Sequence, residues 1–365
     1  MRWVIVVTLL LGAVALAASA AIMDGAWWTR HVVVPACYLP PPPFIGPAFR
    51  WGLGVAALAL VATAFRVRRT TAAGASRIGL AVLAALGISE LGLRALDRPE
   101  PRTHHPRIEF LMGGFDLRTG WSFTPKKVVR FGAPEGGPVI DYFVDAQGDR
   151  APSTEFVERP DAPTLLVTGE SMAVGHGLEW PQTFAAQAGA RLGLQVVNVA
   201  EGGYGSDQAL LRAQDALQRL HHPVALVSTV LPVQLHRNLA DTRPHFELRD
   251  GSLMLVPAFA PRIRLRELIA DDLQILPEWR LQKSLQLTRA ILAATAQAAR
   301  DRGARPLFVG VVFGPAPDLL RDMLEGLPHR IVALDPARIM RWDGHPDPQG
   351  ARQIADAIVQ YVNSP

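Results

Sequence analysis

The stretch Thr164-Leu165-Leu166-Val167-Thr168-Gly169-Glu170-Ser171 places a serine directly after a short apolar run. Such a run predicts a buried strand, and the glycine allows the chain to turn sharply where the strand ends. Hydrolases expose a nucleophilic serine hydroxyl in this way, at a turn between a strand and a helix. Ser171 is therefore a candidate nucleophile, and the alternative is that it only caps the next helix.

The segment Asp343-Gly344-His345-Pro346 near the C-terminus could supply the rest of this chemistry. A carboxylate can orient an imidazole, and the imidazole can then take the proton of a serine. We expect His345 to act as general base and Asp343 to orient it. Asp335 and Asp347 are possible replacements for Asp343, and a plain loop histidine beside a turn aspartate is the alternative.

From residue 161 onwards, strand-like runs alternate with helical stretches. The expected strands are 164–168, 195–200, 224–231, 306–313 and 331–334, and the expected helices are 180–193, 207–220, 283–302, 317–326 and 348–362. This alternation predicts an α/β fold, a three-layer α/β/α domain around a parallel, flavodoxin-like sheet. Sites in such sheets form at the carboxyl ends of the strands, where Ser171, Gly203 and His345 all fall.

Two regions fall outside this alternation. Residues 98–160 comprise a linker rich in proline and a small lead-in of short apolar runs, which predicts β structure. Residues 232–282 interrupt the later pattern and contain Asp250-Gly251, which predicts a hairpin turn. An insertion of this length beside a strand end is typical of a lid or a substrate wall.

The first hundred residues are the most apolar part of the chain and predict about three transmembrane helices. The candidates are Trp3–Met23, Pro47–Phe65 and Ile78–Leu96. An arginine cluster at 66–69 lies in the short loop between the second and third, and the positive-inside rule places it in the cytoplasm. Everything after residue 97 would then lie on the periplasmic, extracytoplasmic side of a multi-pass inner-membrane protein.

This interpretation divides the chain into a membrane region (1–97), a linker with a β-rich lead-in (98–160) and an α/β domain (161–365). Two alternatives stay open for the membrane region. Ala18-Ser19-Ala20 could end a cleaved signal peptide, and the second and third stretches could form a buried hairpin of a soluble domain. Glu90 is costly in lipid and is expected to pair with Arg94 on the same helix face.

Charge and cysteine content exclude several classes of function. The chain has 365 residues, and its 37 basic and 33 acidic residues give a formal charge of +4. Because the arginines are scattered and not interleaved with aromatic residues, no nucleic-acid partner is expected. The one cysteine, Cys37, rules out an internal disulfide and a CxxC metal site. We expect neither a metal nor an organic cofactor.

Taken together, these segments make residues 161–365 resemble the SGNH (GDSL-type) hydrolases. Gly169-Glu170-Ser171 stands where that family has Gly-Asp-Ser, the segment 198–208 is similar to its second block, and Asp343-Gly344-His345-Pro346 is similar to its last. The resemblance implies that the amides of Ser171 and Gly203 bind the oxyanion. The N-terminal apolar helices are similar to those of bacterial membrane-anchored members.

One position departs from the family pattern. The third block of the family places an asparagine after the third strand as an oxyanion donor, and Val233 holds that place here. A valine side chain cannot donate a hydrogen bond, and losing one such donor typically costs about 10² to 10³ in rate. Gln234 and Asn238 are candidates to replace it.

These observations predict an exported, membrane-anchored serine esterase or O-acyltransferase. Its substrate would be an O-acyl ester of a small molecule, lipid or glycan, and its N-terminal helices would contact membrane lipids. The alternative from another class is a weak or inactive domain that binds an acylated glycan or organises a cell-envelope complex. An α/β-hydrolase is disfavoured, because its G-x-S-x-G motif needs glycine where this chain has Ala173.

Overall fold

The computed structural model describes residues 2–33, 44–69, 71–96, 113–132, 138–240, 243–258, 275–313, 317–340 and 344–364. These belong to two compact units, one of Met1–Glu100 with Pro261–Pro277 and one of Pro101–Ala260 with Glu278–Pro365. Residues 98–112, at the start of the predicted linker and lead-in, and the candidate Asp343 lie outside the described residues.

The N-terminal unit is helical. Its elements are α1 (Arg2–Ile22), α2 (Gly25–Trp28), a π-helix η1 (Thr29–Val33), α4 (Ile45–Arg69) and α5 (Ala72–Leu96). Helices α1 and α4 pack closely, because Gly12 lets the side chain of Leu60 approach the backbone of α1. Val6, Ala64 and Val67 are buried in this contact.

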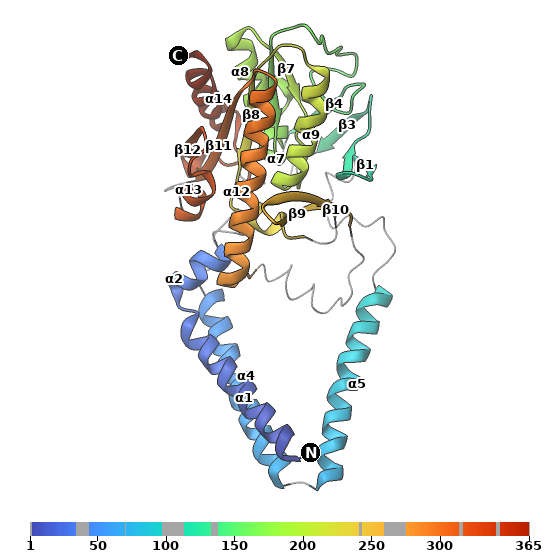
Figure 1. The fold of residues 1–365 in the computed structure, drawn as a ribbon, viewed down its shortest axis with the longest axis vertical. Helices are drawn as coiled ribbons and strands as arrows, with labels where there is room; N and C mark the ends of the chain where they lie inside the picture. Colours follow the sequence, from blue (N-terminus) through green and yellow to red (C-terminus); the bar gives the residue numbers. More distant parts are fainter. Residues whose placement is uncertain are drawn as a thin grey trace. The chain divides into compact units, whose positions relative to one another are not determined.

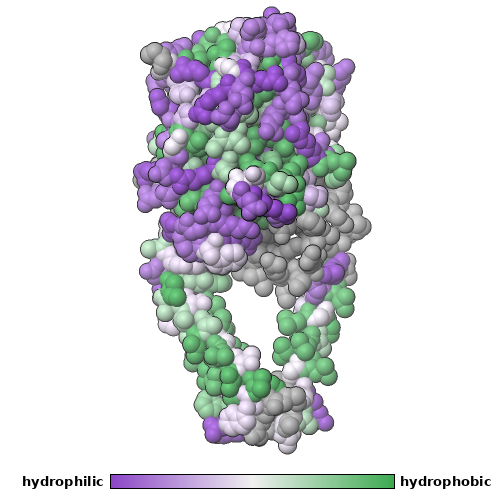
Figure 2. All heavy atoms as spheres, viewed as in Figure 1, coloured by the Kyte–Doolittle hydropathy of each residue, from purple (hydrophilic) through white to green (hydrophobic). Residues whose placement is uncertain are grey.

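Two of these helices are long and apolar enough to cross a membrane, Trp3–Ile22 in α1 and Gly46–Arg69 in α4. Most of their large apolar side chains are exposed, and Figure 2 shows hydrophobic residues covering these helices. Helix α5 is not a candidate span within the described residues, so the third crossing stays a prediction. The expected pair within α5 is present, with Arg94 Nε donating to Glu90 Oε1 at 2.7 Å.

The second unit is built on one eight-stranded sheet with the order β12-β11-β8-β6-β7-β5-β4-β3. Five of these strands are parallel: β6 (Thr164–Thr168), β7 (Gln195–Asn198), β8 (Pro223–Val230), β11 (Arg305–Phe313) and β12 (His329–Leu334). Numbered along the chain, they have the order 2-1-3-4-5, which is that of flavodoxin-like sheets. The predicted α/β fold with a parallel, flavodoxin-like sheet is confirmed for these five strands.

The lead-in adds three strands to this sheet and makes it mixed. They are β3 (Val128–Gly132), β4 (Val139–Val144) and β5 (Arg150–Ala151). All three run antiparallel to their neighbours, and β5 joins the parallel part through Arg150 and Asn198. The sheet therefore extends beyond the parallel part expected, because the short lead-in strands pair with the open edge of β7.

Helices cover both faces of the sheet (Figure 1). Helices α8 (Phe184–Leu192) and α14 (Pro348–Asn363) contact each other, as do α9 (Ser206–Arg219) and α12 (Glu278–Asp301). Apolar residues of α9 and α12 pack on Leu166, Val197 and Leu226 of the central strands. Helix α13 (Asp318–Leu324) contacts α12 and β11.

Two hairpins accompany the sheet, β1 (Gly113–Asp116) with β2 (Gly120–Phe123) and β9 (His245–Arg249) with β10 (Ser252–Val256). The second turns at Asp250 and Gly251, whose φ angles are 49° and 77°. Positive φ at both central positions is the requirement of a type I′ hairpin turn. The predicted Asp-Gly hairpin is therefore confirmed, and it belongs to the insertion at 232–282.

Candidate active site

The structure brings the candidate nucleophile and the candidate base together. Ser171 is the first residue of the short helix α7 (Ser171–Val174), directly after β6, and His345 lies in the loop before α14. The Nε2 atom of His345 is 2.7 Å from the Oγ atom of Ser171, although 174 residues separate them in sequence. This distance is that of a hydrogen bond through which a serine proton can pass to an imidazole.

Gly169 makes the turn before Ser171 possible. Its φ angle is +137°, and a Cβ atom at this position would lie 2.2 Å from Thr229 Oγ1 and 3.1 Å from the Cβ atom of Ala173. Residues with a side chain rarely adopt this backbone conformation, and here the side chain would also collide with β8. The close approach of β6, α7 and β8 therefore requires glycine at 169.

Glu170 fixes the beginning of α7. Its Oε2 atom accepts hydrogen bonds from the Met172 amide and from Ser171 Oγ, both at 3.0 Å, and its Oε1 atom accepts one from Thr229. Ser171 Oγ carries one proton and so has two alternative acceptors, Glu170 Oε2 and His345 Nε2. The second arrangement is the one that a general base needs.

The loop that carries His345 is held at both ends. The Met340 amide donates to the carbonyl of His345 at 2.9 Å, and Ile339 pairs with Pro346 in an isolated antiparallel bridge. The ring of His176 packs on that of His345, with centroids 4.6 Å apart. In the sequence, the only sign that His176 could reach His345 was its position five residues after Ser171.

The acid partner is the part of the site that the structure does not place. Asp343 lies outside the described residues, whereas both replacements considered from the sequence are described. Asp347 caps α14 through the amides of Gln349 and Gly350, and Asp335 caps a 3₁₀ turn at Pro336–Arg338. Among the described residues, no hydrogen bond or ion pair joins either carboxylate to His345, so Asp343 stays the proposed partner.

Two backbone amides are available for an oxyanion. Ser171 and Gly203 are both buried, and their N–H groups donate no hydrogen bond within the part of the chain that the structure describes. The Gly202 amide is likewise unpaired there. Gly203 has a φ angle of +75° in the turn closed by the Tyr204 amide and the carbonyl of Glu201. Buried amides without partners are rare in proteins, and a ligand oxygen would satisfy them.

The third-block region offers no such donor. Val233 is buried beside α10 (Gln234–Arg237). The side-chain amide of Gln234 donates to the carbonyl of Thr229 at 3.3 Å, and that of Asn238 donates to Thr288 at 2.8 Å. Their oxygen atoms accept hydrogen bonds from Ser206. Both side chains tie α9 to its neighbours, and neither contacts Ser171 or His345.

Buried charges lie behind the Gly202-Gly203 turn. Burial lowers the pKa of Arg243 to about 10, while the nearby Asp207 carboxylate opposes this shift. Burial also raises the pKa of Asp207, which the positive charge of Arg243 counteracts. The Arg243 guanidinium is therefore charged at neutral pH. No group of three or more potential metal ligands occurs among the residues described.

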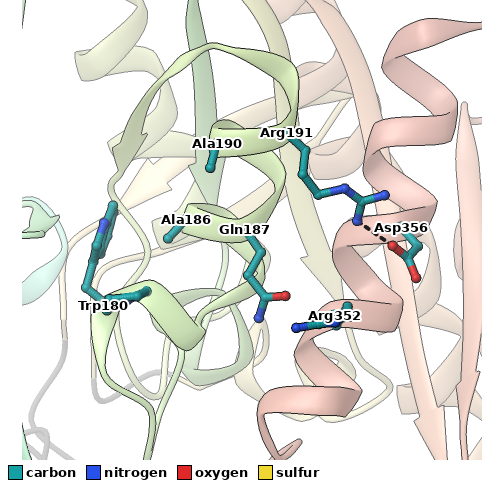
Figure 3. Close-up of a pocket in the computed structure, with 8 residues that line it drawn as sticks. Trp180, Ala186, Gln187, Ala190, Arg191, Arg352 and Asp356 are labelled. Carbon is teal, nitrogen blue, oxygen red and sulfur yellow. Dashed lines mark hydrogen bonds and ion pairs between the residues drawn. The ribbon is translucent and has the colours of Figure 1, made fainter.

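A separate pocket of about 690 Å³ lies between α8 and α14 (Figure 3). Its lining includes Trp180, Gln187 and Arg352, together with the ion pair of Arg191 and Asp356. It shares no lining residue with the cavity of about 10 Å³ between His176 and His345. The large pocket is therefore not part of the Ser171 site.

No protein family model and no curated protein matches the chain. Several solved structures match the chain, and three of them are similar to about half of it. They are TesA (19% identity, 55% of this chain and 98% of that chain, TM-score 0.34), a putative G-D-S-L lipolytic protein from Desulfitobacterium hafniense (11%, 54% and 98%, 0.31), and a G-D-S-L lipolytic family member from Veillonella parvula (8%, 54% and 96%, 0.31).

The similar structures include members of the G-D-S-L family, which the sequence blocks predicted. At TM-scores of 0.31 to 0.34 the similarity supports no argument about this chain. It assigns no role to any residue, so the roles proposed below rest on the contacts of this chain.

Proposed function

We propose that the protein is a serine hydrolase of O-acyl esters, with Ser171 as nucleophile and His345 as general base. The observation that carries this proposal is the distance of 2.7 Å between Ser171 Oγ and His345 Nε2. The unpaired amides of Ser171 and Gly203 support it, because they supply donors for a developing oxyanion. Asp343, two residues before His345, is the proposed acid partner.

The reaction would proceed in two halves through an acyl-enzyme. In the first, Ser171 Oγ forms a bond to the acyl carbon as its proton moves to His345 Nε2. The carbon–oxygen bond to the alcohol then breaks, and His345 returns that proton to the leaving oxygen. In the second, water attacks the acyl carbon as one of its protons moves to His345. The bond from the acyl carbon to Ser171 Oγ then breaks, His345 returns the proton to Ser171 Oγ, and the acid is released.

An acyltransferase would use the same acyl-enzyme with a hydroxyl group of an acceptor in place of water. The two activities therefore share Ser171 and His345, and they differ only in the second half-reaction. The acyl donor would be an ester-bearing small molecule, lipid or glycan. None of these steps calls for a metal or an organic cofactor.

The activity is tested with esters of short and long acyl chains and with acetylated sugars, using the full chain in detergent. We expect turnover by the wild type and its loss in Ser171→Ala and in His345→Ala. Equal activity of the wild type and His345→Ala would remove the histidine from the mechanism. Product analysis with added glycan or alcohol then separates hydrolysis from acyl transfer.

We also propose that α1, α4 and α5 cross the inner membrane and place the α/β domain on the periplasmic side, because only an odd number of crossings separates that domain from the cytoplasmic arginines at 66–69. The length and apolar surface of α1 and α4 support an anchor, the arginines at 66–69 support a cytoplasmic end of α4, and the orientation of the domain depends on a further crossing by α5. A variant with Cys37→Ser and Ser252→Cys carries one thiol, on the exposed start of β10. A membrane-impermeant maleimide should label it in spheroplasts, and labelling only after lysis would contradict the orientation.

A binding domain without catalysis is the second candidate, and Val233 is the observation that favours it. Neither Gln234 nor Asn238 supplies the missing donor, so the oxyanion would depend on backbone amides alone. Saturable binding of an acylated glycan without turnover would support this candidate. Ester turnover that depends on Ser171 would exclude it.

A further inference from the structure

Three consecutive carbonyl groups behind the candidate oxyanion donor are each bound by a side chain from elsewhere in the chain. Trp121 Nε1 donates to the carbonyl of Gly202 at 3.1 Å. The carbonyl of Gly203 accepts from Arg243 at 3.0 Å, and that of Tyr204 accepts from Arg237 at 3.1 Å. The residues of this turn are buried, so their carbonyls need partners within the protein, and these three side chains hold the turn from behind.

The bond from Trp121 acts directly on the amide of Gly203. The carbonyl of Gly202 and the N–H of Gly203 belong to one planar trans peptide, in which they point in opposite directions. When Trp121 holds the carbonyl, the N–H must point away from the indole. A hydrogen bond to the carbonyl also polarises the peptide and makes its N–H a stronger donor.

This turn needs such an anchor because of its sequence. Two adjacent glycines have wide conformational freedom, and Gly203 has a φ angle of +75°. Without a partner for the Gly202 carbonyl, the peptide could rotate and change the direction of the Gly203 N–H. An oxyanion donor is effective only when it is oriented before the reaction. Val233 leaves this site without the side-chain donor, which increases its dependence on Gly203.

The anchor is itself rigid. Trp121 lies on β2 and is 6% exposed, and the Arg243 guanidinium lies 5.9 Å from the centroid of its ring. The hydroxyl of Tyr204 donates to the carbonyl of Trp121 at 2.7 Å, which connects the turn to β2 a second time. The start of the turn contacts the segment between β6 and Ser171, because the Glu201 amide donates to the carbonyl of Gly169 at 3.3 Å.

We propose that Trp121 is a positioning residue for ester hydrolysis, which orients the Gly202–Gly203 peptide so that the Gly203 amide serves the oxyanion. Arg243 fixes the following peptide in the same way. The inference rests on the proposed function and goes beyond it, because the lead-in before residue 160 then completes the active site of the α/β domain.

The test compares Trp121→Phe, which keeps an aromatic ring and removes the indole N–H, with the wild type. We expect kcat to fall about 10- to 100-fold and KM to change by no more than about twofold. This fall in kcat is at most equal to the smallest loss, about 10², that follows removal of a whole oxyanion donor. The inhibition constant of a trifluoromethyl ketone should rise by the same factor as kcat/KM falls. This inhibitor forms a tetrahedral adduct, so it reports the oxyanion site itself.

Trp180→Phe is the matched control, because Trp180 lines the separate pocket, and it should leave all three constants unchanged. If Trp121→Phe does not fold, 3-benzothienylalanine at position 121 replaces the N–H with sulfur at nearly constant shape. Wild-type kcat/KM and inhibitor affinity in either folded variant would overturn the inference while leaving the proposed function intact. If the wild type turns over no ester, the proposed function fails and the inference fails with it.

Discussion

Thr229 Oγ1 donates a hydrogen bond of 2.9 Å to Oε1 of Glu170, which connects the end of β8 to the residue before the candidate nucleophile. Both side chains are buried. The other carboxylate oxygen of Glu170 holds the Met172 amide at 3.0 Å. The position of Ser171 is therefore set by the two neighbouring strands β6 and β8, and substitutions at the end of either strand should change that position.

Gly169→Ala should disrupt this connection. The new Cβ atom would lie 2.2 Å from Thr229 Oγ1, so the free energy of unfolding should fall by more than about 2 kcal/mol through overpacking and backbone strain. Gly193→Ala is the control, because Gly193 also has a positive φ angle but open space around it. Urea denaturation in detergent measures both, and equal losses would show that the contact with Thr229 is unimportant.

Asp343 and Asp347 should respond differently to substitution. Asp343→Asn should lower kcat by up to about 10⁴-fold, as expected for the acid partner of a catalytic histidine. Asp347→Ala removes the cap of α14 and should cost about 1 kcal/mol of stability with little change in kcat. Steady-state kinetics measure the change in kcat, and melting curves measure the change in stability, for both variants. A large loss of kcat only in Asp347→Ala would reverse the assignment.

Val233→Asn tests whether this position can hold an oxyanion donor. If the side chain reaches the oxyanion, kcat should rise, by at most the factor of about 10² to 10³ that one donor supplies. Val233→Ala is the control, because it shortens the same buried side chain without adding a donor. An asparagine variant no faster than the alanine variant would show that the position does not face the oxyanion.

The buried Asp149 should make stability depend on pH. Burial raises its pKa from 3.8 to about 6, against the opposing charges of Arg212 and Arg219. Between these values the folded protein binds the proton more tightly than the unfolded chain, so this group adds stability as the pH falls. At about 1.4 kcal/mol per pKa unit, the gain approaches 3 kcal/mol. The full gain is reached only below about pH 4, so urea denaturation at pH 7 and pH 5 should show about 1.3 kcal/mol of it in the wild type and none in Asp149→Asn.

The sequence predicted the elements whose signals are local. Strand β6 has the expected bounds, and α14 begins at Pro348 as expected, after an aspartate cap. The hairpin at Asp250-Gly251 was predicted because both residues tolerate positive φ. The meeting of Ser171 and His345 followed from topology, since carboxyl ends of parallel strands share one edge of the sheet.

What the sequence did not predict depends on contacts between distant segments. Nothing local in Arg150-Ala151 shows that it pairs beside Asn198 and so extends the sheet. The same holds for the hydrogen bond of Trp121 to Gly202, which joins residues 81 positions apart. A tryptophan in a short strand has many possible burial sites, and its sequence context does not select among them.

Labelling of Ser171 by a fluorophosphonate tests the central claim most directly, because the probe reacts fastest with a serine whose proton a neighbouring base accepts as the serine attacks. The folded wild type at neutral pH should form a single adduct, mapped by mass spectrometry to Ser171. The labelling rate should fall at least about 100-fold in His345→Ala. No adduct, an adduct on another residue, or equal rates in the two proteins would contradict the account.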